Sequence, residues 1–329
     1  MADEVRPRRG SAPSHGGFPP GNPVGWFQVA ESRELAAGQV VALDCFDAPL
    51  VLFRTSSGVP HVLDAHCPHL GAHLGFGGEV EGEAIRCPFH GHCYDGSGAC
   101  IKIPRADKIP PLDRARAWPI VERAGMIFVH HDPLGREPLW QLPAFHWHDD
   151  PEWTAFECAA SAVITGHVQD IVENTVDVAH FQPVHGTPIV WCGVEADGPL
   201  FTTHLGVAPG QSKIDSWCHG LGCTLSQTSS LRSITTQTPL TNRKLHLRSY
   251  FSIQRGDPAT LEHRRVTRYK FQSEEVFGRD LVIWGNKAWR ARPPLCAADG
   301  PIAEYRRWCA QFYPDLTAAG PVPVPAPVQ

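Results

Sequence analysis

Short apolar runs, each broken by glycine, proline or another turn residue, dominate the first part of the chain. Turn residues such as Gly38, Ser57-Gly58 and Gly77-Gly78 separate these runs. Many short strands divided in this way are typical of antiparallel β structure. We therefore predict a small antiparallel β domain over residues 24–131. Its strands are expected at residues 40–43, 50–53, 59–63, 84–86, 101–103, 118–121 and 126–129.

The pattern changes after residue 131. Residues 132–150 are dense in Pro and Trp, and we interpret them as the connection to a second domain over residues 132–313. Apolar positions at helical spacing predict a helix over residues 168–180, which Pro183 is expected to end near Phe181. Two further amphipathic helices are predicted over residues 274–289 and 301–312. Strands are predicted at residues 154–164, 200–205, 231–237, 245–253 and 263–272.

Composition narrows the function classes. Gly, Pro, Arg and Ser at the start, and Pro, Ala and Val at the end, predict disordered tails over residues 1–23 and 314–329. A net charge of -5 without a basic stripe predicts no nucleic-acid binding. We expect buried free thiols rather than a disulfide framework from eleven cysteines in 329 residues. Neither a membrane-spanning run nor the apolar core of a signal peptide is evident, which predicts a cytoplasmic protein.

The strongest chemical signal is a pair of mixed sulfur–nitrogen motifs. Cys67 and His69 form a Cys-x-His pair, and Cys87 and His90 form a Cys-x-x-His pair. Structural zinc sites also use two Cys and two His, but pair Cys with Cys and His with His. Two Cys on one iron and two His on the other are the ligands of a Rieske [2Fe–2S] cluster. We interpret the motif as a Rieske cluster, with zinc as the alternative.

Three neighbouring residues predict a low reduction potential. Respiratory Rieske proteins have a disulfide between their two ligand loops, and its positions correspond here to Ala72 and Phe89. His92 occupies the position of a serine that donates a hydrogen bond to the cluster. Fewer hydrogen bonds to the sulfurs leave more negative charge on the cluster and lower its potential. We therefore predict a cluster of the ferredoxin or oxygenase type.

A second metal site is predicted at the end of the first long helix. Asp177 and His180 are three residues apart and would share one helix face. His185 follows Pro183, where the chain can curl back so that both imidazoles meet one ion. Two His and one carboxylate bind iron in non-haem Fe(II) oxygenases and leave positions open for dioxygen. Ordinary surface or packed histidines are the alternative, since the chain has eighteen.

With both motifs in place, the chain resembles the Rieske non-haem iron oxygenases, specifically their terminal oxygenase subunits. It is most similar to the branch of 3-ketosteroid 9α-hydroxylase oxygenase components and cholesterol 7-desaturases. The resemblance implies an α+β fold, in which an antiparallel β Rieske domain precedes a helix-grip catalytic domain with a curved antiparallel sheet. It rests on residues 62–72, 103–110, 173–181, 280–284 and 305–313.

The resemblance also implies residue roles. Asp280 matches the carboxylate that completes the mononuclear iron site with His180 and His185. Asp177 matches a carboxylate that bridges the iron's first His and, across a subunit boundary, a cluster His, here His90. Such bridging implies a head-to-tail homotrimer. From sequence alone three nearby acids compete with Asp280 for the third ligand position, namely Glu274, Glu275 and Asp299.

The implied activity is hydroxylation or desaturation of a small apolar substrate of the steroid or sterol type, with O2 as co-substrate. Electrons would come from NAD(P)H through an external ferredoxin or flavin reductase, because no Gly-x-Gly-x-x-Gly follows a strand here. A non-steroid aromatic or alicyclic substrate, a plain Rieske electron-transfer protein and a zinc-stabilised binding protein are the alternatives. We expect the pocket among Val190, Trp191, Phe201, Leu205, Trp217, Leu221 and Phe251.

Overall fold

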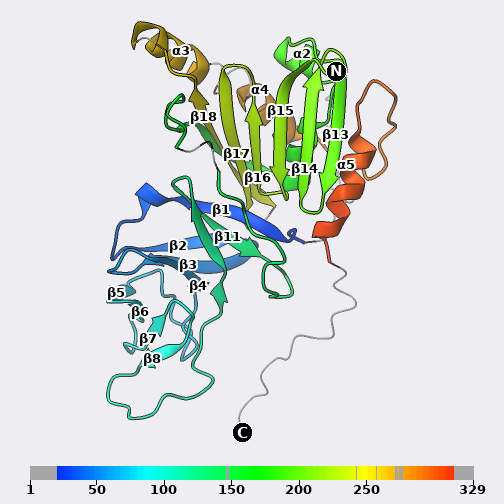
Figure 1. Ribbon diagram of the computed structural model, residues 1–329. Helices are drawn as coiled ribbons and strands as arrows, with labels where there is room; N and C mark the ends of the chain where they lie inside the picture. The colour runs from blue at the N-terminus through cyan, green and yellow to red at the C-terminus, as the bar shows by residue number, and fades with distance from the viewer. Residues whose placement is uncertain are drawn as a thin grey trace, which may run out of the picture.

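The computed structural model describes residues 21–314, except 146, 148, 242, 257, 271, 272 and 274–276. The predicted tails therefore lie outside the described residues, apart from residues 21–23 and 314. The chain builds two parts, one above the other in Figure 1. Small sheets make the lower part, and one large sheet with helices makes the upper part.

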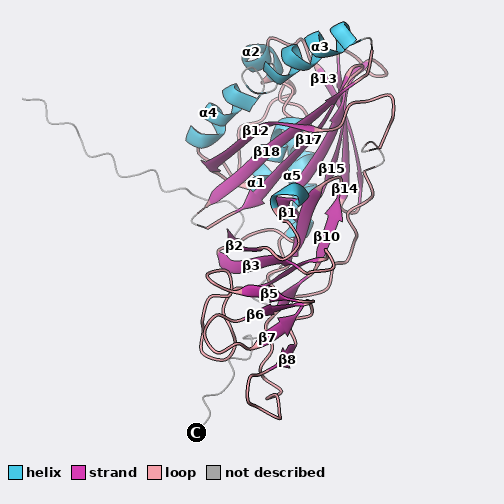
Figure 2. Ribbon diagram, turned by 90° about the vertical axis from the view of Figure 1, so that its left-hand side faces the viewer, coloured by secondary structure: helices cyan, strands magenta, loops and turns pink. Residues whose placement is uncertain are grey.

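The lower part contains three antiparallel sheets. One has the strand order β1-β11-β10, the second β2-β3-β4-β9 and the third β5-β6-β7-β8. The third sheet, at the lower end in Figures 1 and 2, holds the second cluster loop between β6 and β7. The bounds are β1 (Gly25–Glu31), η1 (Ser32–Glu34), β2 (Val40–Cys45), β3 (Ala48–Arg54), β4 (Pro60–Asp64), β5 (Glu79–Glu81), β6 (Ala84–Arg86), β7 (Cys93–Asp95), β8 (Cys100–Lys102), β9 (Ala117–Trp118), β10 (Ile120–Arg123) and β11 (Met126–His131).

The upper part is built on a seven-stranded antiparallel sheet with the order β12-β18-β17-β16-β15-β14-β13. Figure 2 shows its strands twisting and curving, with α2, α3 and α4 toward the end far from β5–β8. The strands are β12 (Glu157–Thr165), β13 (Trp191–Asp197), β14 (Leu200–Gly206), β15 (Ser212–His219), β16 (Cys223–Gln227), β17 (Leu231–Pro239) and β18 (Lys244–Ile253). The helices are α1 (Val168–Val172), η2 (Glu173–Thr175), α2 (Phe181–His185), α3 (Pro258–Lys270), α4 (Arg279–Asn286), α5 (Ile302–Cys309) and η4 (Ala310–Phe312).

A shared core joins the two parts. Phe27 on β1 belongs to the same buried apolar cluster as Leu247 on β18. Next to it, the fully buried Gln28 donates from Nε2 to the Tyr250 hydroxyl at 2.7 Å and accepts from the Thr236 hydroxyl at 2.6 Å. Buried polar groups are stable only when they are paired in this way. The first strand of the lower part is therefore anchored on the large sheet.

The predicted fold class is confirmed: antiparallel sheets form an N-terminal Rieske-type part, and a curved antiparallel sheet with helices forms the second. The predicted helix over residues 168–180 is wrong in its extent, because α1 ends at Val172 and η2 at Thr175. Pro183 ends no helix, since it lies in the first turn of α2. Proline is tolerated there because the first turn's N–H groups have no partner within the helix.

Two other predicted elements differ as well. The strand expected at residues 263–272 lies largely in α3, where Pro258 occupies the first position. The sequence pattern misled because Val266 and Tyr269 are apolar but remain half exposed. Pro258 at the helix start and the basic residues in the last turn are helix signals that should have outweighed these two apolar positions. The helix expected over residues 274–289 is described only as α4, and residues 274–276 lie outside the described residues.

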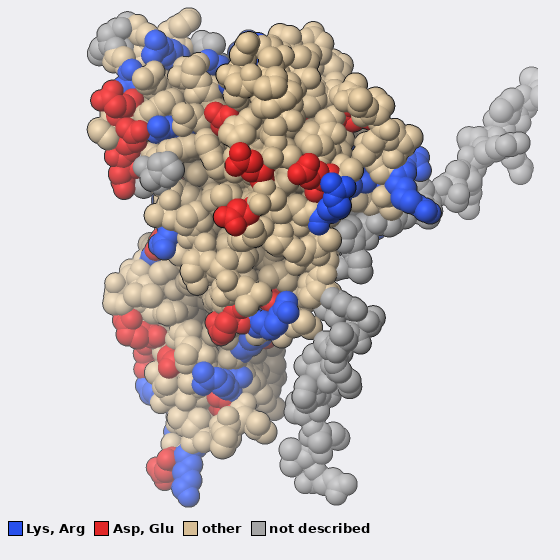
Figure 3. All heavy atoms as spheres, turned by 45° about the vertical axis from the view of Figure 1, so that its right-hand side comes forward, with Lys and Arg blue, Asp and Glu red and all other residues tan. Residues whose placement is uncertain are grey.

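On the face in Figure 3, acidic and basic side chains form small mixed groups on a largely uncharged surface. Within the described part of the chain, no helix combines the length and the apolar character needed to cross a bilayer.

Candidate functional site: two metal centres and a cavity

The two predicted cluster loops have the same backbone geometry. In the first, the Gly71 N–H donates to the Cys67 carbonyl at 2.9 Å, and the Cys67 N–H donates to the Ala72 carbonyl at 2.8 Å. In the second, Gly91 and Cys87 repeat the first of these bonds at 3.1 Å. Gly71 and Gly91 have φ angles of 76° and 73°, which strain any side chain but suit glycine. The two Cys–Gly turns thus form a matched pair.

The four candidate ligands lie together at the tips of these loops. Cys67 and Cys87 are buried at 2% and 1% exposure, in the same buried cluster. His69 and His90 are exposed, with ring centroids 4.7 Å apart. Burial raises the pKa of the Cys67 thiol, although the Tyr94 hydroxyl, 3.1 Å from Sγ, opposes the shift. Buried sulfurs and exposed imidazoles suit a cluster whose histidine-bound iron lies at the surface.

The structure also brings together the candidate iron ligands. His180 precedes α2, His185 is the last residue of α2, and Asp280 is the second residue of α4. One donor atom from each lies within 4.8 Å of the other two. His185 Nε2 and Asp280 Oδ2 are 3.4 Å apart, and both side chains are 7% exposed. Two ligands about 2.0–2.2 Å from one ion lie roughly 3–3.5 Å apart, so the spacing fits a shared metal.

A hydrogen bond prepares His180 for metal binding. Its Nδ1 lies 2.5 Å from the Asp177 carbonyl oxygen, which can only accept, so Nδ1 must donate. The other ring nitrogen, Nε2, is then left with a free lone pair in the neutral ring. Burial lowers the pKa of His180 and so favours the neutral ring. The Asp177 carbonyl and carboxylate oppose this shift. The chain therefore sets the tautomer that a metal needs.

Asp280 gives a second sign of a missing partner. Its side chain is buried, and Oδ1 has no hydrogen-bond partner among the residues that the structure describes. A buried carboxylate oxygen without a partner is costly. A divalent cation bound by two imidazoles and this carboxylate would remove the cost, so these residues fit a mononuclear iron.

Neighbouring residues hold the two helices at this spacing. Arg279 donates from Nη1 to the Val184 carbonyl at 2.6 Å, so the residues next to both Asp280 and His185 are joined. One turn along α4, the Trp284 Nε1–H donates to Asn174 Oδ1 in η2 at 3.3 Å. These contacts fix α4 against the segment with His180 and His185. Arg279 and Asn174 were not predicted from the sequence, because only the folded chain shows what they contact.

Of the three rival acids, the described one, Asp299, does not share this place. Asp299 lies in a turn, where its Oδ2 accepts from the Cys296 N–H at 2.6 Å. Glu274 and Glu275 lie outside the described residues. The ligand roles of His180, His185 and Asp280, like those of the four cluster residues, stay predictions. Asp177 also remains a predicted bridge, with a side chain that is 31% exposed.

A cavity of about 240 Å³ opens beside the three candidate iron ligands. Pockets for small molecules usually measure roughly 300–1,000 Å³, so this space lies just below that range and suits one small ligand. Of the seven apolar residues expected to line it, only Leu205 is among the described lining residues. Phe201, Leu221 and Phe251 are buried core instead, as large apolar side chains more often are, whereas Val190 is 70% exposed.

Hydroxyl groups from the large sheet line much of the cavity instead. Ser226 on β16 pairs directly with Ser216 on β15 and with Ser233 on β17. Thr235 on β17 pairs with Ser249 on β18. These residues therefore form rows across the inner face of the sheet, and all five line the cavity. The alternation of Ser and Thr along β16 and β17 was the sequence signal for this face, since every second residue points to the same side.

Known proteins share both parts of this architecture. Residues 25–113 match the Rieske [2Fe-2S] domain model, and residues 129–313 match the model of the 3-ketosteroid 9alpha-hydroxylase C-terminal domain. Among solved structures, dicamba monooxygenase bound to dicamba has a TM-score of 0.69 at 21% identity, over 88% of this chain and 96% of that one. NdmA of Pseudomonas putida CBB5 has a TM-score of 0.70 at 18% identity, over 87% and 88%. The architecture is therefore that of a Rieske-type oxygenase.

The second match specifies the family. The 3-ketosteroid-9-alpha-monooxygenase oxygenase component of Rhodococcus rhodochrous is 30% identical over 90% of this chain and 85% of the relative. Cholesterol 7-desaturase of Bombyx mori is 29% identical over 90% of this chain and 70% of the relative. The chain belongs to the Rieske oxygenase family that has the 3-ketosteroid 9α-hydroxylase C-terminal domain. The predicted resemblance and enzyme class are confirmed.

Proposed function

We propose that the protein is the terminal oxygenase of a system that hydroxylates or desaturates a steroid or sterol with O2. The single observation that supports this most is the His180–His185–Asp280 group, half-buried to buried, on the wall of the cavity. When bound, the cluster would supply electrons one at a time, and the mononuclear iron would supply dioxygen activation. NAD(P)H would be used through a separate reductase.

The chain's own residues position the reaction. Cys67 and Cys87 would hold one iron of the cluster inside the loops, while His69 and His90 would hold the other at the surface. His180 and His185 would present neutral imidazoles, and Asp280 a carboxylate, beside the cavity. A substrate in the cavity would therefore lie next to the open positions of the iron.

The lining points to a neutral substrate with several oxygen atoms. None of the described lining residues is Lys or Arg, so the cavity offers no side chain that is always cationic to an acid. Rows of hydroxyl groups offer both donors and acceptors, while Ile171, Phe181 and Leu205 offer apolar contact. A steroid with oxygen functions at more than one ring fits this surface better than a sterol with a single hydroxyl.

The test is a turnover screen with the cluster-loaded, iron-loaded protein and a reductase that supplies electrons. Steroids with two or more oxygen functions, cholesterol and an aromatic carboxylic acid are compared by mass spectrometry. We expect a gain of one oxygen or a loss of two hydrogens from the oxygenated steroids. Turnover of the aromatic acid alone would refute the steroid proposal, and reduction of the cluster without any oxidised product would favour an electron-transfer protein.

Electrons would pass between subunits of a head-to-tail homotrimer. The cluster loops and α2 lie at opposite ends of the folded molecule in Figures 1 and 2, which supports electron transfer to a neighbouring copy. Exposed apolar side chains belong to this end of the chain: Phe89, 63% exposed, packs on His90, and Phe76, 71% exposed, packs on His73. Asp177 contacts His180, since its Oδ1 accepts the His180 N–H at 3.3 Å, yet it keeps an exposed edge. We place that edge against His90 of the neighbouring copy.

Two variants test this arrangement. Phe76→Glu should shift the protein from trimer to monomer in sedimentation, because a charge would be buried in the interface. Leu139→Glu is the matched control, since Leu139 is 84% exposed and lies away from the cluster loops in the chain. Asp177→Ala should keep both metal centres and the trimer but lose turnover. Full activity of Asp177→Ala would remove its bridging role.

A further inference from the structure

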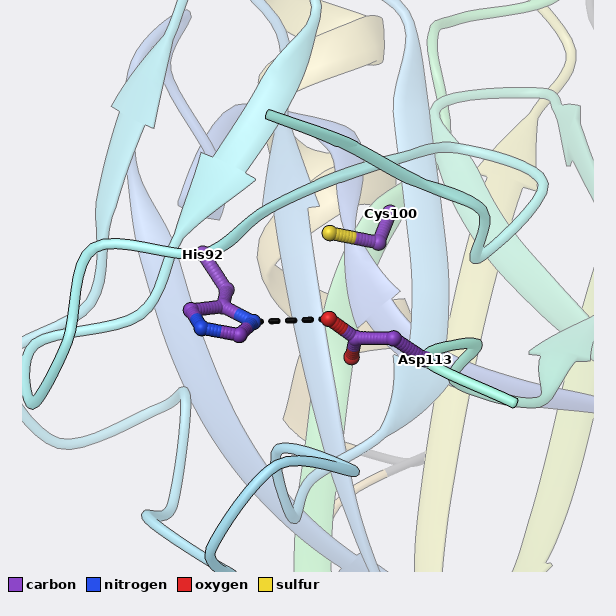
Figure 4. Close-up of side chains that lie close together, drawn as sticks. All are labelled: His92, Cys100 and Asp113. Atoms are coloured by element: carbon purple, nitrogen blue, oxygen red, sulfur yellow. Dashed lines mark hydrogen bonds and ion pairs between the residues drawn. The ribbon is translucent and has the colours of Figure 1, made fainter. Parts of the chain in front are cut away.

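A buried carboxylate lies beneath the cluster loops. Asp113 is 9% exposed, and its Oδ2 lies 2.7 Å from His92 Nδ1. Its Oδ1 accepts the Tyr94 hydroxyl at 2.7 Å. Figure 4 shows the His92 ring to the left of this carboxylate and the Cys100 sulfur above it. Polar hydrogens from several neighbours thus converge on one acidic group.

The distances favour a hydrogen-bond network over another metal site. His92, Cys100 and Asp113 are residue types that bind metals, and their donor atoms lie within 4.8 Å of one another. Two donors bound to one tetrahedral zinc at about 2.0–2.1 Å would lie roughly 3.3 Å apart. The 2.7 Å between His92 and Asp113 is instead a normal charge-assisted hydrogen bond. Burial and the carboxylate raise the pKa of Cys100 to about 12, so it stays a thiol.

Tyr94 has one proton and two acceptors. Its hydroxyl oxygen lies 2.7 Å from Asp113 Oδ1 and 3.1 Å from Cys67 Sγ. A cysteine that binds a cluster is a thiolate and can only accept, and an ionised carboxylate can only accept. A hydroxyl carries one hydrogen, so it cannot donate to both. The shorter distance to a full negative charge directs the hydrogen to Asp113.

We propose that Asp113 turns the Tyr94 hydroxyl away from Cys67 and thereby keeps the reduction potential of the cluster low. Hydrogen bonds to the cluster sulfurs stabilise the reduced, more negative state and raise the potential. Asp113 withholds one such bond from Cys67. It acts as a positioning residue, because it touches Tyr94 and not the cluster. The inference rests on Cys67 being a cluster ligand, as proposed above.

Asp113→Asn can keep both contacts of residue 113 but reverses the direction of its hydrogen bond with Tyr94. The Asn oxygen can still accept from His92, while its NH2 group can donate to the Tyr94 oxygen. The Tyr94 hydrogen is then free to point at Cys67. The hydrogen bond between His92 and residue 113 also helps to position a second cluster ligand. The His92 ring stacks on His69 with centroids 4.3 Å apart and an angle of 10°.

The experiment is a cycle of four proteins, each with its cluster loaded: the wild type, Asp113→Asn, Tyr94→Phe and the double variant. We expect Asp113→Asn to shift the balance toward reduced cluster at least about tenfold at a fixed potential, which is about 59 mV for one electron. Tyr94→Phe alone should change this balance less than about twofold. When Asp113→Asn is added to Tyr94→Phe, the shift in potential should be less than half of the shift that Asp113→Asn causes in the wild type, since the hydroxyl is gone. The remainder is the loss of the carboxylate charge.

The opposite pattern would overturn the proposal. If Tyr94 donated to Cys67 in the wild type, Tyr94→Phe alone would lower the potential, and this variant tests the idea even if Asp113→Asn does not fold. An equal Asp113→Asn shift with and without the hydroxyl would show that charge alone acts. Pulsed electron–nuclear spectroscopy after exchange into D2O gives a direct check. One more strongly coupled deuteron should appear near the reduced cluster in Asp113→Asn than in the wild type or the double variant.

Absorption and electron paramagnetic resonance spectra distinguish failure of the Asp113 proposal from failure of the proposed cluster ligands. A Rieske spectrum in all four proteins leaves only the role of Asp113 in question. No such spectrum in the wild type would instead remove the proposed cluster ligands and the function that depends on them.

Discussion

Asp280 should make the iron-free protein less stable and the iron-loaded protein more stable. Its carboxylate is buried, Oδ2 lies 3.4 Å from His185 Nε2, and Oδ1 has no hydrogen-bond partner in the described part of the chain. A buried polar group without a partner costs about 1–3 kcal/mol, and a charged one costs more. Asp280→Asn removes the charge at almost constant volume. In the absence of iron we therefore expect the variant to be the more stable protein.

The size of the effect follows from the same contacts. A gain of about 1–2 kcal/mol corresponds to a rise in Tm of roughly 2–8 °C for a domain of 150–250 residues. Iron acts in the opposite direction, since a ligand at 100 times its Kd stabilises the native state by about 2.7 kcal/mol. The wild type should receive this stabilisation, and Asp280→Asn should lose most of it because an amide carries no charge. The order of the two Tm values should reverse when Fe(II) is added.

The assay is anaerobic thermal unfolding by circular dichroism, with cluster-loaded protein in a chelator and in excess Fe(II). Asp299→Asn is the matched control, because Asp299 is a rival acid that instead accepts from the Cys296 N–H. Its Tm should rise with Fe(II) as much as that of the wild type. A lower Tm for Asp280→Asn in chelator would refute the reasoning on the buried charge. An undiminished rise with Fe(II) would refute the role of Asp280 as a ligand.

Three further outcomes are expected. Arg279→Ala should weaken Fe(II) binding about tenfold in a titration, since it frees α4 from the Val184 carbonyl, while Arg307→Ala on α5 should not. Burial lowers the pKa of His219 to about 4. The contribution of the neutral ring to the free energy of unfolding should therefore be complete above pH 6.5 and fall toward pH 4 by up to about 1.4 kcal/mol per pH unit. His219→Gln should flatten the dependence of the unfolding free energy on pH between pH 4 and 6.5. Thr235→Val should raise KM for an oxygenated steroid several-fold and leave KM for a substrate without that oxygen unchanged, whereas equal changes for both would indicate a packing defect.

The local patterns of the sequence determined many of the strands and the metal-binding motifs. The matched turns around Cys67 and Cys87 need only short-range residue types, namely a ligand, a proline and a glycine that accepts a positive φ. His180 and His185 lie close in the chain, so their spacing alone suggested a shared ion. Such features depend on neighbours within a few residues, which a single sequence displays.

Tertiary structure decided what distant segments do to one another. Asp280 lies 95 residues after His185, and only packing selects it over Asp299. The short helices around Pro183 and the helix at residues 258–270 also escaped the periodic pattern, because tertiary contacts outweigh weak local preference. The same holds for Asp113, which meets Tyr94 and His92 across two strands and a loop. Whether its carboxylate or Cys67 receives the Tyr94 hydrogen depends on distances of a few tenths of an ångström, and these exist only in the folded chain.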